Sequence, residues 1–235
     1  LGDVYKRQRR KRSMENLVII ILKMAFNNIY SGKKVLITGN TGFKGSWLTA
    51  WLLSLGAEVY GYSDRVPTTP SMYEAIGLDT KVKQTFADIR NLEDFEAVVQ
   101  KIKPDFIFHL AAQAIVSTSY ADPLNTVTTN VTGTAVVMEA IRNIDWDCTC
   151  VIITSDKAYD NVEWIWGYRE NDALGGKDVY SGSKGAAELV IKSYWHSFIK
   201  HKDNIRMGVA RAGNVIGGGD WAKDRIIVDL SLIHI

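Results

Sequence analysis

A glycine-rich turn between an apolar run and a helical pattern constrains this chain more than any other feature. Residues 34–46 read KVLITGNTGFKGS, and the glycines stand at positions 39, 42 and 45. The apolar run at 35–37 is typical of a buried strand, and apolar residues at helical spacing follow up to position 55. In such a unit the glycines permit a tight turn and let the backbone approach a phosphate at the helix N-terminus. The alternative is a plain structural turn, because the spacing is G-x-x-G-x-x-G rather than G-x-G-x-x-G.

The same alternation of strand and helix continues along the chain. Strands are expected at residues 58–62, 81–86, 106–110, 151–154 and 206–210, and helices at residues 92–102, 125–144 and 180–198. Strands that are almost continuously apolar and separated by helices indicate a parallel sheet covered on both faces. The sequence therefore predicts an α/β fold, a Rossmann-like doubly wound parallel sheet.

Composition and charge argue against several kinds of partner. A net charge of +2 gives no sign of nucleic-acid binding, and the four histidines show no metal-ligand spacing, so neither nucleic acid nor a metal is expected. The apolar run at 17–22 is too short to span a bilayer, so no membrane association is expected. Cys148 and Cys150 would share one strand face, where they are poorly placed to form a disulfide. Buried thiols in a reducing, cytoplasmic environment are the expectation.

Tyr180 and Lys184 place a phenol and an ammonium group four residues apart, on the same face of an expected helix. The positive charge of a neighbouring lysine favours the phenolate form of a tyrosine. Such a pair can take a proton from a hydroxyl group while hydride leaves the same carbon. The alternative is an incidental surface pair, since Y-x-x-x-K also arises by chance.

A polar cluster of Thr154, Ser155, Asp156 and Lys157 follows the expected strand at 151–154. Ligands of open parallel sheets bind beyond the carboxyl ends of the strands, so these side chains should face a ligand crevice. A helix cap or turn is the alternative, for this cluster and for Asp88, because Ser and Asp favour both. His109, within an apolar strand, is expected to be a core histidine rather than a catalyst.

Together these motifs resemble the extended short-chain dehydrogenase/reductase superfamily of nucleotide-sugar enzymes, an NAD-dependent epimerase/dehydratase family. The resemblance covers residues 33–229 and includes the glycine turn, the stretches at 110–112 and 130–133, and the Tyr180/Lys184 pair. Closer still, the stretches at 41–47, 154–157, 164–171 and 211–221 are similar to CDP-glucose 4,6-dehydratases.

This resemblance implies a hydro-lyase cycle without net redox, which turns CDP-glucose into CDP-4-keto-6-deoxyglucose for bacterial surface polysaccharide such as O-antigen. The C4 carbon is oxidised with NAD⁺ as hydride acceptor, water is eliminated across C5 and C6, and hydride returns to C6. By position, Ser155 would hold the 4-hydroxyl, Tyr180 beside Lys184 would take its proton, and Asp156 would protonate the departing 6-hydroxyl. Lys157 stands where related dehydratases carry Glu, and would either take the C5 proton or order a group that does.

The resemblance also implies the ligand contacts. Asp64 favours NAD, whereas Ser63 with Arg65 would tolerate a 2′-phosphate, and the resemblance favours NAD. Ser117 replaces a family arginine, which removes one contact near the substrate. Substrate binding is expected at Ser155, Arg211, Asn214, Trp221 and Arg225. NAD binding is expected at Gly39, Thr41, Gly42, Phe43, Lys44, Gly45, Ser63, Asp64, Asp88, Ile89, Leu110, Ala111, Ala112, Gln113, Asn130, Thr154, Tyr180 and Lys184.

Two alternatives remain open at this stage. A nucleotide-sugar 4-epimerase or reductase needs Tyr180 and Lys184 but no acid at Asp156, and a non-catalytic NAD-binding domain needs neither reaction. A homodimer through the helices at 125–144 and 180–198 is expected by resemblance.

The ends of the chain differ in character from its middle. Residues 1–30 combine a basic run at 6–12 with the short apolar run, and residues 230–235 also look foreign to the fold. We expect a non-native or disordered leader at 1–30 and a natural start near Met24. Residues 31–229 would form the NAD-binding domain with the start of a substrate-binding region whose C-terminal part is missing, and 230–235 a non-native tail.

Overall fold

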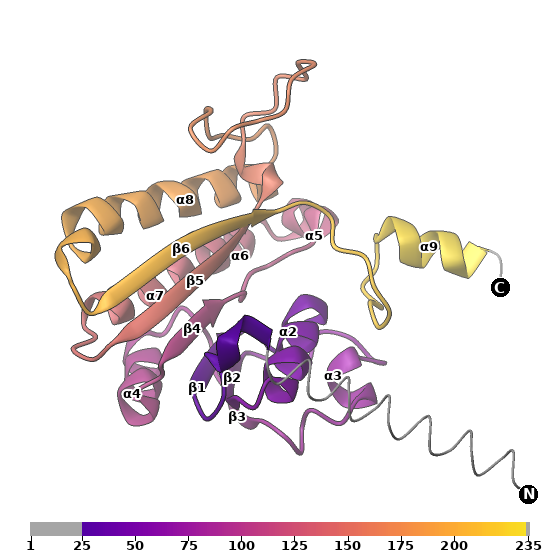
Figure 1. Cartoon of the computed structure of the whole chain (residues 1–235). Coiled ribbons are helices and arrows are strands. Elements are labelled where there is room, and N and C mark those ends of the chain that lie inside the picture. The colour runs from indigo at the N-terminus through magenta and orange to yellow at the C-terminus, as the bar shows by residue number, and fades with distance from the viewer. Residues whose placement is uncertain (1–24, 234–235) are drawn as a thin grey trace, which may run out of the picture.

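The computed structural model describes residues 25–233 and contains a six-stranded sheet in the order β3-β2-β1-β4-β5-β6 (Figure 1). All neighbouring strands run parallel. The strands are β1 Lys34–Thr38, β2 Glu58–Ser63, β3 Lys83–Phe86, β4 Phe106–His109, β5 Cys148–Ser155 and β6 Ile205–Ala212. The chain moves outward from β1 to β3 and then returns to place β4 on the other side of β1. This reversal is the switch point of a doubly wound sheet, and it confirms the predicted Rossmann-like fold.

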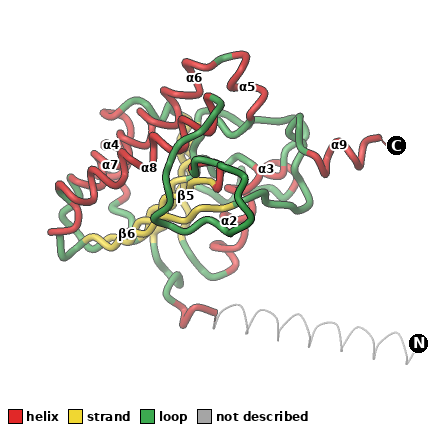
Figure 2. The backbone as a smooth tube through the Cα atoms, turned by 90° about the horizontal axis from the view of Figure 1, so that it is seen from above, coloured by secondary structure: helices red, strands yellow, loops and turns green. Residues whose placement is uncertain are grey.

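Helices cover both faces of the sheet (Figure 2), and each layer of helices packs on its own cluster of buried apolar residues. On one face, α4, α7 and α8 pack on a core that includes Leu36, Ile107 and Ile152. On the other, α2 and α3 pack on Val35, Ile37 and other residues of β1 and β2. Alternate residues of β1 are thus buried on opposite faces, as a covered parallel strand requires. The helices are α2 Phe43–Ser54, α3 Met72–Ala75, α4 Leu92–Ile102, α5 Val116–Ala121, α6 Pro123–Val127, α7 Gly133–Arg142, α8 Val179–Ser197 and α9 Ile226–Ile233.

Several element boundaries differ from the expectation. The helix expected at 125–144 is interrupted by a π-helical segment, η2 Thr128–Thr132, between α6 and α7. The strand expected at 151–154 is longer, because β5 pairs with β6 along its whole length from Cys148 to Ser155. The short helices α3 and α5, and α9, were not expected. Part of the expected leader, residues 1–24, and the end of the expected tail, residues 234–235, lie outside the described residues.

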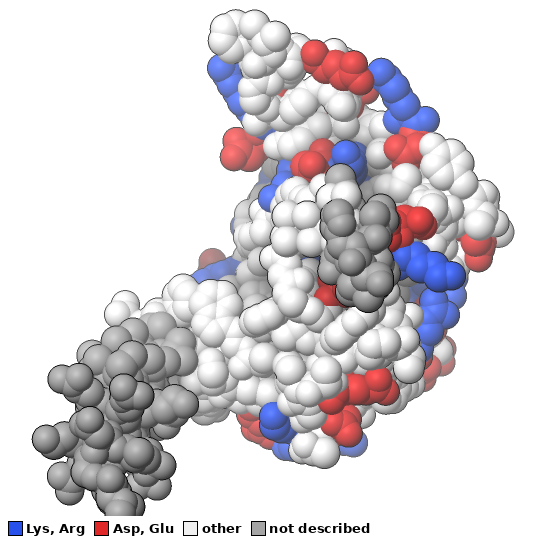
Figure 3. Space-filling model, turned by 90° about the vertical axis from the view of Figure 1, so that its right-hand side faces the viewer, with Lys and Arg blue, Asp and Glu red and all other residues white. Residues whose placement is uncertain are grey.

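Three further properties of the described residues concern membrane spans, surface charge and the two cysteines. None of the helices between residues 25 and 233 combines the length and hydropathy of a membrane span. Acidic and basic side chains are interspersed over the face shown in Figure 3. Cys148 and Cys150 are free and buried with their Sγ atoms 3.8 Å apart, which confirms the expected buried thiols.

Candidate active site

The glycine turn after β1 is formed by close backbone packing. Gly39 has a φ of +72°, and a Cβ atom there would lie 2.7 Å from the backbone N of Ala111. A Cβ at Gly45 would lie 2.1 Å from the carbonyl oxygen of Gly39, so neither position accepts a side chain. Gly42 is different, since a Cβ there would meet only that carbonyl at 3.4 Å. Gly42 also caps α2 without a side-chain hydrogen bond. The first N–H groups of α2 therefore have no capping side chain and suit an anionic group.

Polar side chains at the ends of β2 and β3 support this turn. The hydroxyl of Ser63 donates to Asn40 Oδ1 at 2.8 Å, and Asn40 Nδ2 donates to Gln84 Oε1 at 2.6 Å. Thr41 donates to the carbonyl of Arg65 at 2.6 Å. Ser63 and Thr41 thus hold the turn, and their expected contact with NAD stays a prediction. The exposed carboxylate of Asp64 lies 3.8 Å from the guanidinium of Arg65 at the carboxyl end of β2.

Asp88 forms a local turn, the alternative left open for it by the sequence. Its carboxylate accepts from the backbone N of Arg90 at 2.9 Å and from the Arg90 side chain. Hydrogen bonds from Arg90 hold the pKa of Asp88 below its usual value. Ile89, which follows, is buried in the core. An adenine contact for Asp88 would therefore compete with its partner Arg90.

The segment after β4 is held by hydrogen bonds to β1 and to the π-helical segment. The backbone N–H groups of Leu110 and Ala111 lie 3.2 and 3.1 Å from the Thr38 hydroxyl. Asn130, in the π-helical segment, accepts from the N–H of Gln113 and donates to its carbonyl and to Ser183 of α8. The side-chain amide of Asn130 thus has three partners, all of them within the protein. This residue therefore holds the 110–113 segment, including Ala112, against α8. Such π segments often mark functional positions.

His109 is a core histidine, as expected. Its Nδ1 lies 2.7 Å from the Thr38 hydroxyl and its Nε2 lies 3.3 Å from that of Thr134. Burial, with a smaller effect of Lys184, lowers its pKa from 6.5 to about 3. The imidazole is therefore neutral at physiological pH and is no general acid there.

Tyr180 and Lys184 lie on one face of α8, as the spacing predicted. Each is buried with 8% of its surface exposed, and the Lys184 ammonium lies 5.9 Å from the Tyr180 ring centroid. Burial and the nearby charge of Lys44 lower the pKa of Lys184 to about 8. Burial raises the pKa of Tyr180 and outweighs the lowering effects of Ser155 and Arg225. The expectation that Lys184 favours the phenolate form of Tyr180 stays a prediction.

Ser155, Asp156 and Lys157 form the end of β5 and the start of the short 3₁₀ turn η3 Asp156–Ala158. The Ser155 hydroxyl accepts from the backbone N of Lys157 at 3.2 Å and donates to the Asp156 carboxylate at 3.0 Å. Ser155 thus caps a turn and also lies close enough to Tyr180 to lower its pKa. The negative charge of Asp156 acts to raise the pKa values of both Tyr180 and Lys44. The cluster therefore lies near the end of α8 that carries Tyr180.

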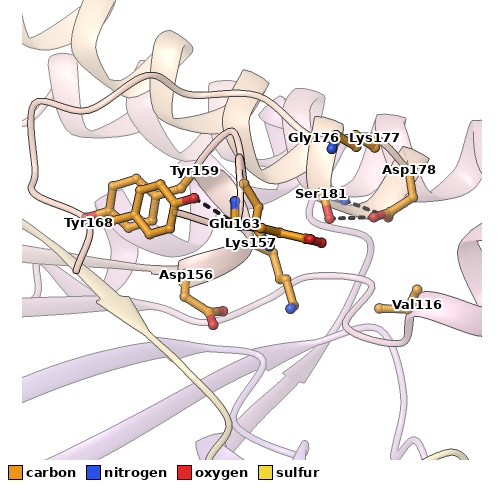
Figure 4. Close-up of a pocket in the computed structure, with 11 residues that line it drawn as sticks. Val116, Asp156, Lys157, Tyr159, Glu163, Tyr168, Gly176, Lys177, Asp178 and Ser181 are labelled. Carbon is orange, nitrogen blue, oxygen red and sulfur yellow. Dashed lines mark hydrogen bonds between the residues drawn. The ribbon is translucent and has the colours of Figure 1, made fainter. Parts of the chain in front are cut away.

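A cavity of about 510 Å³ opens beside this cluster. Figure 4 shows Asp156 and Lys157 between the rings of Tyr159 and Tyr168 and the start of α8. The two tyrosine rings are stacked with centroids 5.1 Å apart. Tyr180 and Lys184 do not line this cavity, although Ser181 does. The cavity therefore adjoins the acid–base pair rather than containing it.

The residues expected to bind substrate are not all brought together. Arg211 is engaged in the protein, because its Nε and Nη2 donate to Glu188 at 2.7 and 2.6 Å and its Nη1 to the carbonyl of Glu170 at 3.2 Å. Asn214 and Trp221 are exposed in the segment after β6. Arg225 acts electrostatically on both Lys44 and Tyr180.

The segment at 213–225 crosses α2 close to the glycine turn. Trp47 donates from Nε1 to the carbonyl of Gly218 at 3.0 Å. A Cβ at Gly217 would lie 3.3 Å from the Phe43 ring, at the first turn of α2. Ser117, where the family carries arginine, donates to Asp224 of the same segment. Arg225 thus lies near the site on a segment that rests on α2.

Two features of the site were missed at the sequence level. Glu188 continues the spacing of Tyr180 and Lys184 by one further helical turn, so the period of α8 could have revealed it. The rings of Tyr159 and Tyr168 stack on each other although a loop separates the two residues in the sequence. No local pattern predicts this stacking.

Two known nucleotide-sugar enzymes are similar to this chain in sequence. The CDP-glucose 4,6-dehydratase of Salmonella typhimurium is 47% identical over 211 residues, covering 88% of this chain and 59% of the relative. The CDP-paratose 2-epimerase of Salmonella typhi is 30% identical over 206 residues, covering 80% of this chain and 59% of the relative. The chain thus spans about 59% of the length of these relatives.

A solved structure supports the fold. The UDP-glucose 4-epimerase of Thermus thermophilus, in complex with NAD, superimposes with a TM-score of 0.69 at 26% identity, over 81% of this chain and 58% of that one. A family model described as GDP-mannose 4,6 dehydratase matches residues 36–207, which include the glycine turn, the Ser155–Lys157 cluster and the Tyr180/Lys184 pair. The chain therefore belongs to the GDP-mannose 4,6-dehydratase family.

Proposed function

We propose that the protein is a nucleotide-sugar 4,6-dehydratase, which converts CDP-glucose to CDP-4-keto-6-deoxyglucose with NAD as its cofactor. One observation carries this proposal: Asp156 and Lys157 lie at the end of β5, beside Tyr180 and Lys184 of α8. Oxidation at C4 needs only the tyrosine and lysine, whereas elimination of water also needs an acid and a base. The identity to the Salmonella typhimurium enzyme supports CDP-glucose as the substrate.

The residues present fit NAD. The turn accepts only glycine at positions 39 and 45, and a Cβ at Gly42 would meet only the Gly39 carbonyl, so a pyrophosphate could approach the start of α2 there. Asp64 at the carboxyl end of β2 would accept hydrogen bonds from the adenine ribose. When bound, NAD supplies a hydride acceptor for C4 and later a hydride donor for C6.

Proton transfer at C4 falls to the buried pair on α8. Tyr180 would take the proton of the 4-hydroxyl while the Ser155 hydroxyl holds that oxygen. With a pKa of about 8, Lys184 stays mainly protonated at neutral pH and supplies a positive charge beside the phenol. Because burial raises the pKa of Tyr180, this charge and that of Arg225 are needed to make the phenol an effective base.

Elimination falls to the residues at the cavity. Asp156 would give a proton to the departing 6-hydroxyl, and Lys157 would take the C5 proton or order a group that does. Both side chains line the cavity of about 510 Å³, which is in the size range of small-molecule sites. We place the glucosyl unit between Tyr180 and this cavity, with its C5–C6 side toward Asp156 and Lys157.

The assembly and location follow from the same proposal. Exposed apolar side chains within the expected helices at 125–144 and 180–198, namely Val127 and Leu189, support a homodimer through these helices. The free thiols of Cys148 and Cys150 suit the cytoplasm. The product would serve surface-polysaccharide synthesis.

The test is incubation of the full-length protein with NAD⁺ and CDP-glucose, with UDP-, dTDP- and GDP-linked sugars in parallel. We expect the 4-keto-6-deoxy product from CDP-glucose. A C4 epimer formed without loss of water would instead indicate an epimerase, the activity of the Thermus thermophilus structure. NAD binding without turnover of any sugar would indicate a binding module.

A further inference from the structure

The buried carboxylate of Glu188 joins three elements around the candidate site. Only 6% of this residue is exposed, and both its oxygens have partners. Thr154 of β5 donates to Oε1 at 2.5 Å, and Arg211 of β6 donates to Oε1 and Oε2 at 2.7 and 2.6 Å. Glu188 itself lies on α8, one turn beyond Lys184 and two beyond Tyr180. The carboxylate therefore connects the helix of the acid–base pair to the strand end of the acid cluster.

Arg211 extends this connection into the loop over the cavity. Its guanidinium lies 4.5 Å from the Tyr159 ring centroid, and its Nη1 donates to the carbonyl of Glu170. The same loop closes at its base, where Asp160 N donates to the Ala173 carbonyl at 2.9 Å and Gly175 N to the Ala158 carbonyl at 3.0 Å. Figure 1 shows this segment projecting from the body of the molecule. Arg211 is thus a link between the buried sheet and the loop that follows Asp156 and Lys157.

The strand register fixes the geometry of the link. Thr154 of β5 pairs with Arg211 of β6, so both donors reach the same carboxylate from neighbouring strands. A bidentate arginine–carboxylate contact also fixes orientation, which a single lysine contact does not. Thr154 directly precedes Ser155, so its contact with Glu188 lies next to the Ser155–Asp156–Lys157 cluster.

We propose that Glu188 and Arg211 are a positioning pair, which sets the Ser155–Asp156–Lys157 cluster and the Tyr159 loop relative to Tyr180 and Lys184. This inference rests on the proposed dehydratase function. Arg211 acts through Glu188 and Tyr159 and does not touch the substrate, in place of the binding role expected from resemblance. The carboxylate beside it raises the pKa of Arg211, so its charge is permanent.

The test must separate positioning from stability. Removing one partner of a buried ion pair leaves an unpaired charge and destabilises a protein, whereas replacing both by apolar side chains is often neutral. We therefore compare Glu188→Gln with the double variant Glu188→Met/Arg211→Met in the full-length protein. Melting temperature, NAD affinity, and kcat and KM for the 4-keto product are measured for each.

The double variant is expected to regain most of the melting temperature lost by Glu188→Gln and to bind NAD normally. Its kcat is expected to stay low, by on the order of 100-fold, with a much smaller change in KM, because misplacement of catalytic groups slows the reaction by such factors. Wild-type kcat in a stable double variant would overturn the proposal.

A matched control comes from another bidentate pair. Glu139 and Arg142 on α7 have the same chemistry but are more exposed and lie outside the site. Glu139→Gln and Arg142→Lys should leave kcat and the loop unchanged. An equal loss of kcat in these variants would show a general effect of removing ion pairs and would contradict a positioning role for Glu188.

Hydrogen exchange gives a reading that needs no substrate. Arg211→Lys keeps the charge but loses the planar fork, so it should fold and show faster amide exchange at Asp160 and Gly175. Unchanged exchange there, with wild-type kcat, would overturn the proposal even if the double variant does not fold. If the wild-type protein makes no product from any sugar, the dehydratase function fails, and the exchange at these two amides still decides the structural link.

Discussion

The glycine turn after β1 and the acid–base cluster after β5 both hold groups that face the expected ligand, but they are shaped by different kinds of contact. Both place groups beyond the carboxyl ends of parallel strands, where ligands of such sheets bind. At the turn, the shape is set by what is absent, since a Cβ at Gly39 or Gly45 would strike backbone atoms. At the cluster, the shape is set by side chains, among them Glu188 and Arg211. The first region depends on local sterics, and the second depends on contacts between distant elements.

The largest expected effect falls on the side-chain region. Tyr180→Phe removes the proton acceptor for the 4-hydroxyl and should lower turnover by on the order of 1,000-fold, because general base catalysis contributes factors of this size. Melting temperature and NAD binding should change little. Tyr194→Phe, on the same helix α8, serves as the control and should keep its turnover. Substantial turnover in Tyr180→Phe would exclude the tyrosine as the base.

The next effect falls on the backbone region. Gly45→Ala places a methyl group 2.1 Å from the Gly39 carbonyl and should destabilise the fold by about 3 kcal/mol, as overpacking does. Gly182→Ala, in the interior of α8 with open space around it, should instead stabilise by about 0.5–1 kcal/mol. Urea unfolding of both variants measures the difference. Similar stabilities would mean that the turn is not set by backbone packing.

A substitution at Asp156 should separate the two proposed chemical steps, oxidation at C4 and elimination of water. Asp156→Asn should spare hydride transfer to NAD⁺ but slow elimination by on the order of 100-fold, since the amide cannot supply the proton. Single-turnover absorbance of NADH would show a reduced cofactor that accumulates. Asp203→Asn, an exposed carboxylate near the start of β6, should behave as wild type. Unchanged product formation in Asp156→Asn would remove its assigned role.

The smallest effect concerns His109, which lies between Thr38, directly before the glycine turn, and Thr134 of α7. Its pKa is lowered to about 3 in the folded state, chiefly by burial. The unfolded chain therefore binds the extra proton as the pH falls below about 6.5, and stability falls with it by up to about 1.4 kcal/mol per pH unit. Urea unfolding between about pH 5 and pH 7 measures this slope.

His109→Asn provides the comparison for that slope. The asparagine does not titrate, so the variant should show a flatter dependence of stability on pH than the wild type. Equal slopes in the two proteins would show that His109 is protonated in the fold or that other groups dominate.

Much of the architecture was predictable because burial leaves a periodic trace. The helix at Leu92–Ile102 has the expected bounds, and all six strands were predicted and differ from the expectation only at their ends. The exposed tryptophans Trp47 and Trp51 show the limit of this reasoning, since their apolar spacing on α2 does not correspond to full burial. The π-helical segment at Thr128–Thr132 was missed, and its Asn130 bonds to Gln113 and Ser183, which lie far from it in the sequence.

The candidate site likewise has some features that the sequence predicted and others that required the fold. Tyr180, Lys184 and the cluster at 154–157 were recognisable because their spacing and their place after a strand are local properties. The state of Tyr180 was not, since its pKa depends on burial by parts of the chain far from it in sequence. The engagement of Arg211 with Glu188, and of Arg90 with Asn125 and Thr128, also required the fold.

The sequence by itself determined the alternation of strands and helices, the glycine turn and the pair of residues on one face of α8. Each follows from the period of a helix or strand, or from the missing Cβ of glycine, and so needs only neighbouring residues. The tertiary structure alone decided that Thr154, Glu188 and Arg211 meet, and that a cavity opens beside Asp156. These contacts join β5, α8 and β6, and they depend on a strand order and register that no local pattern specifies.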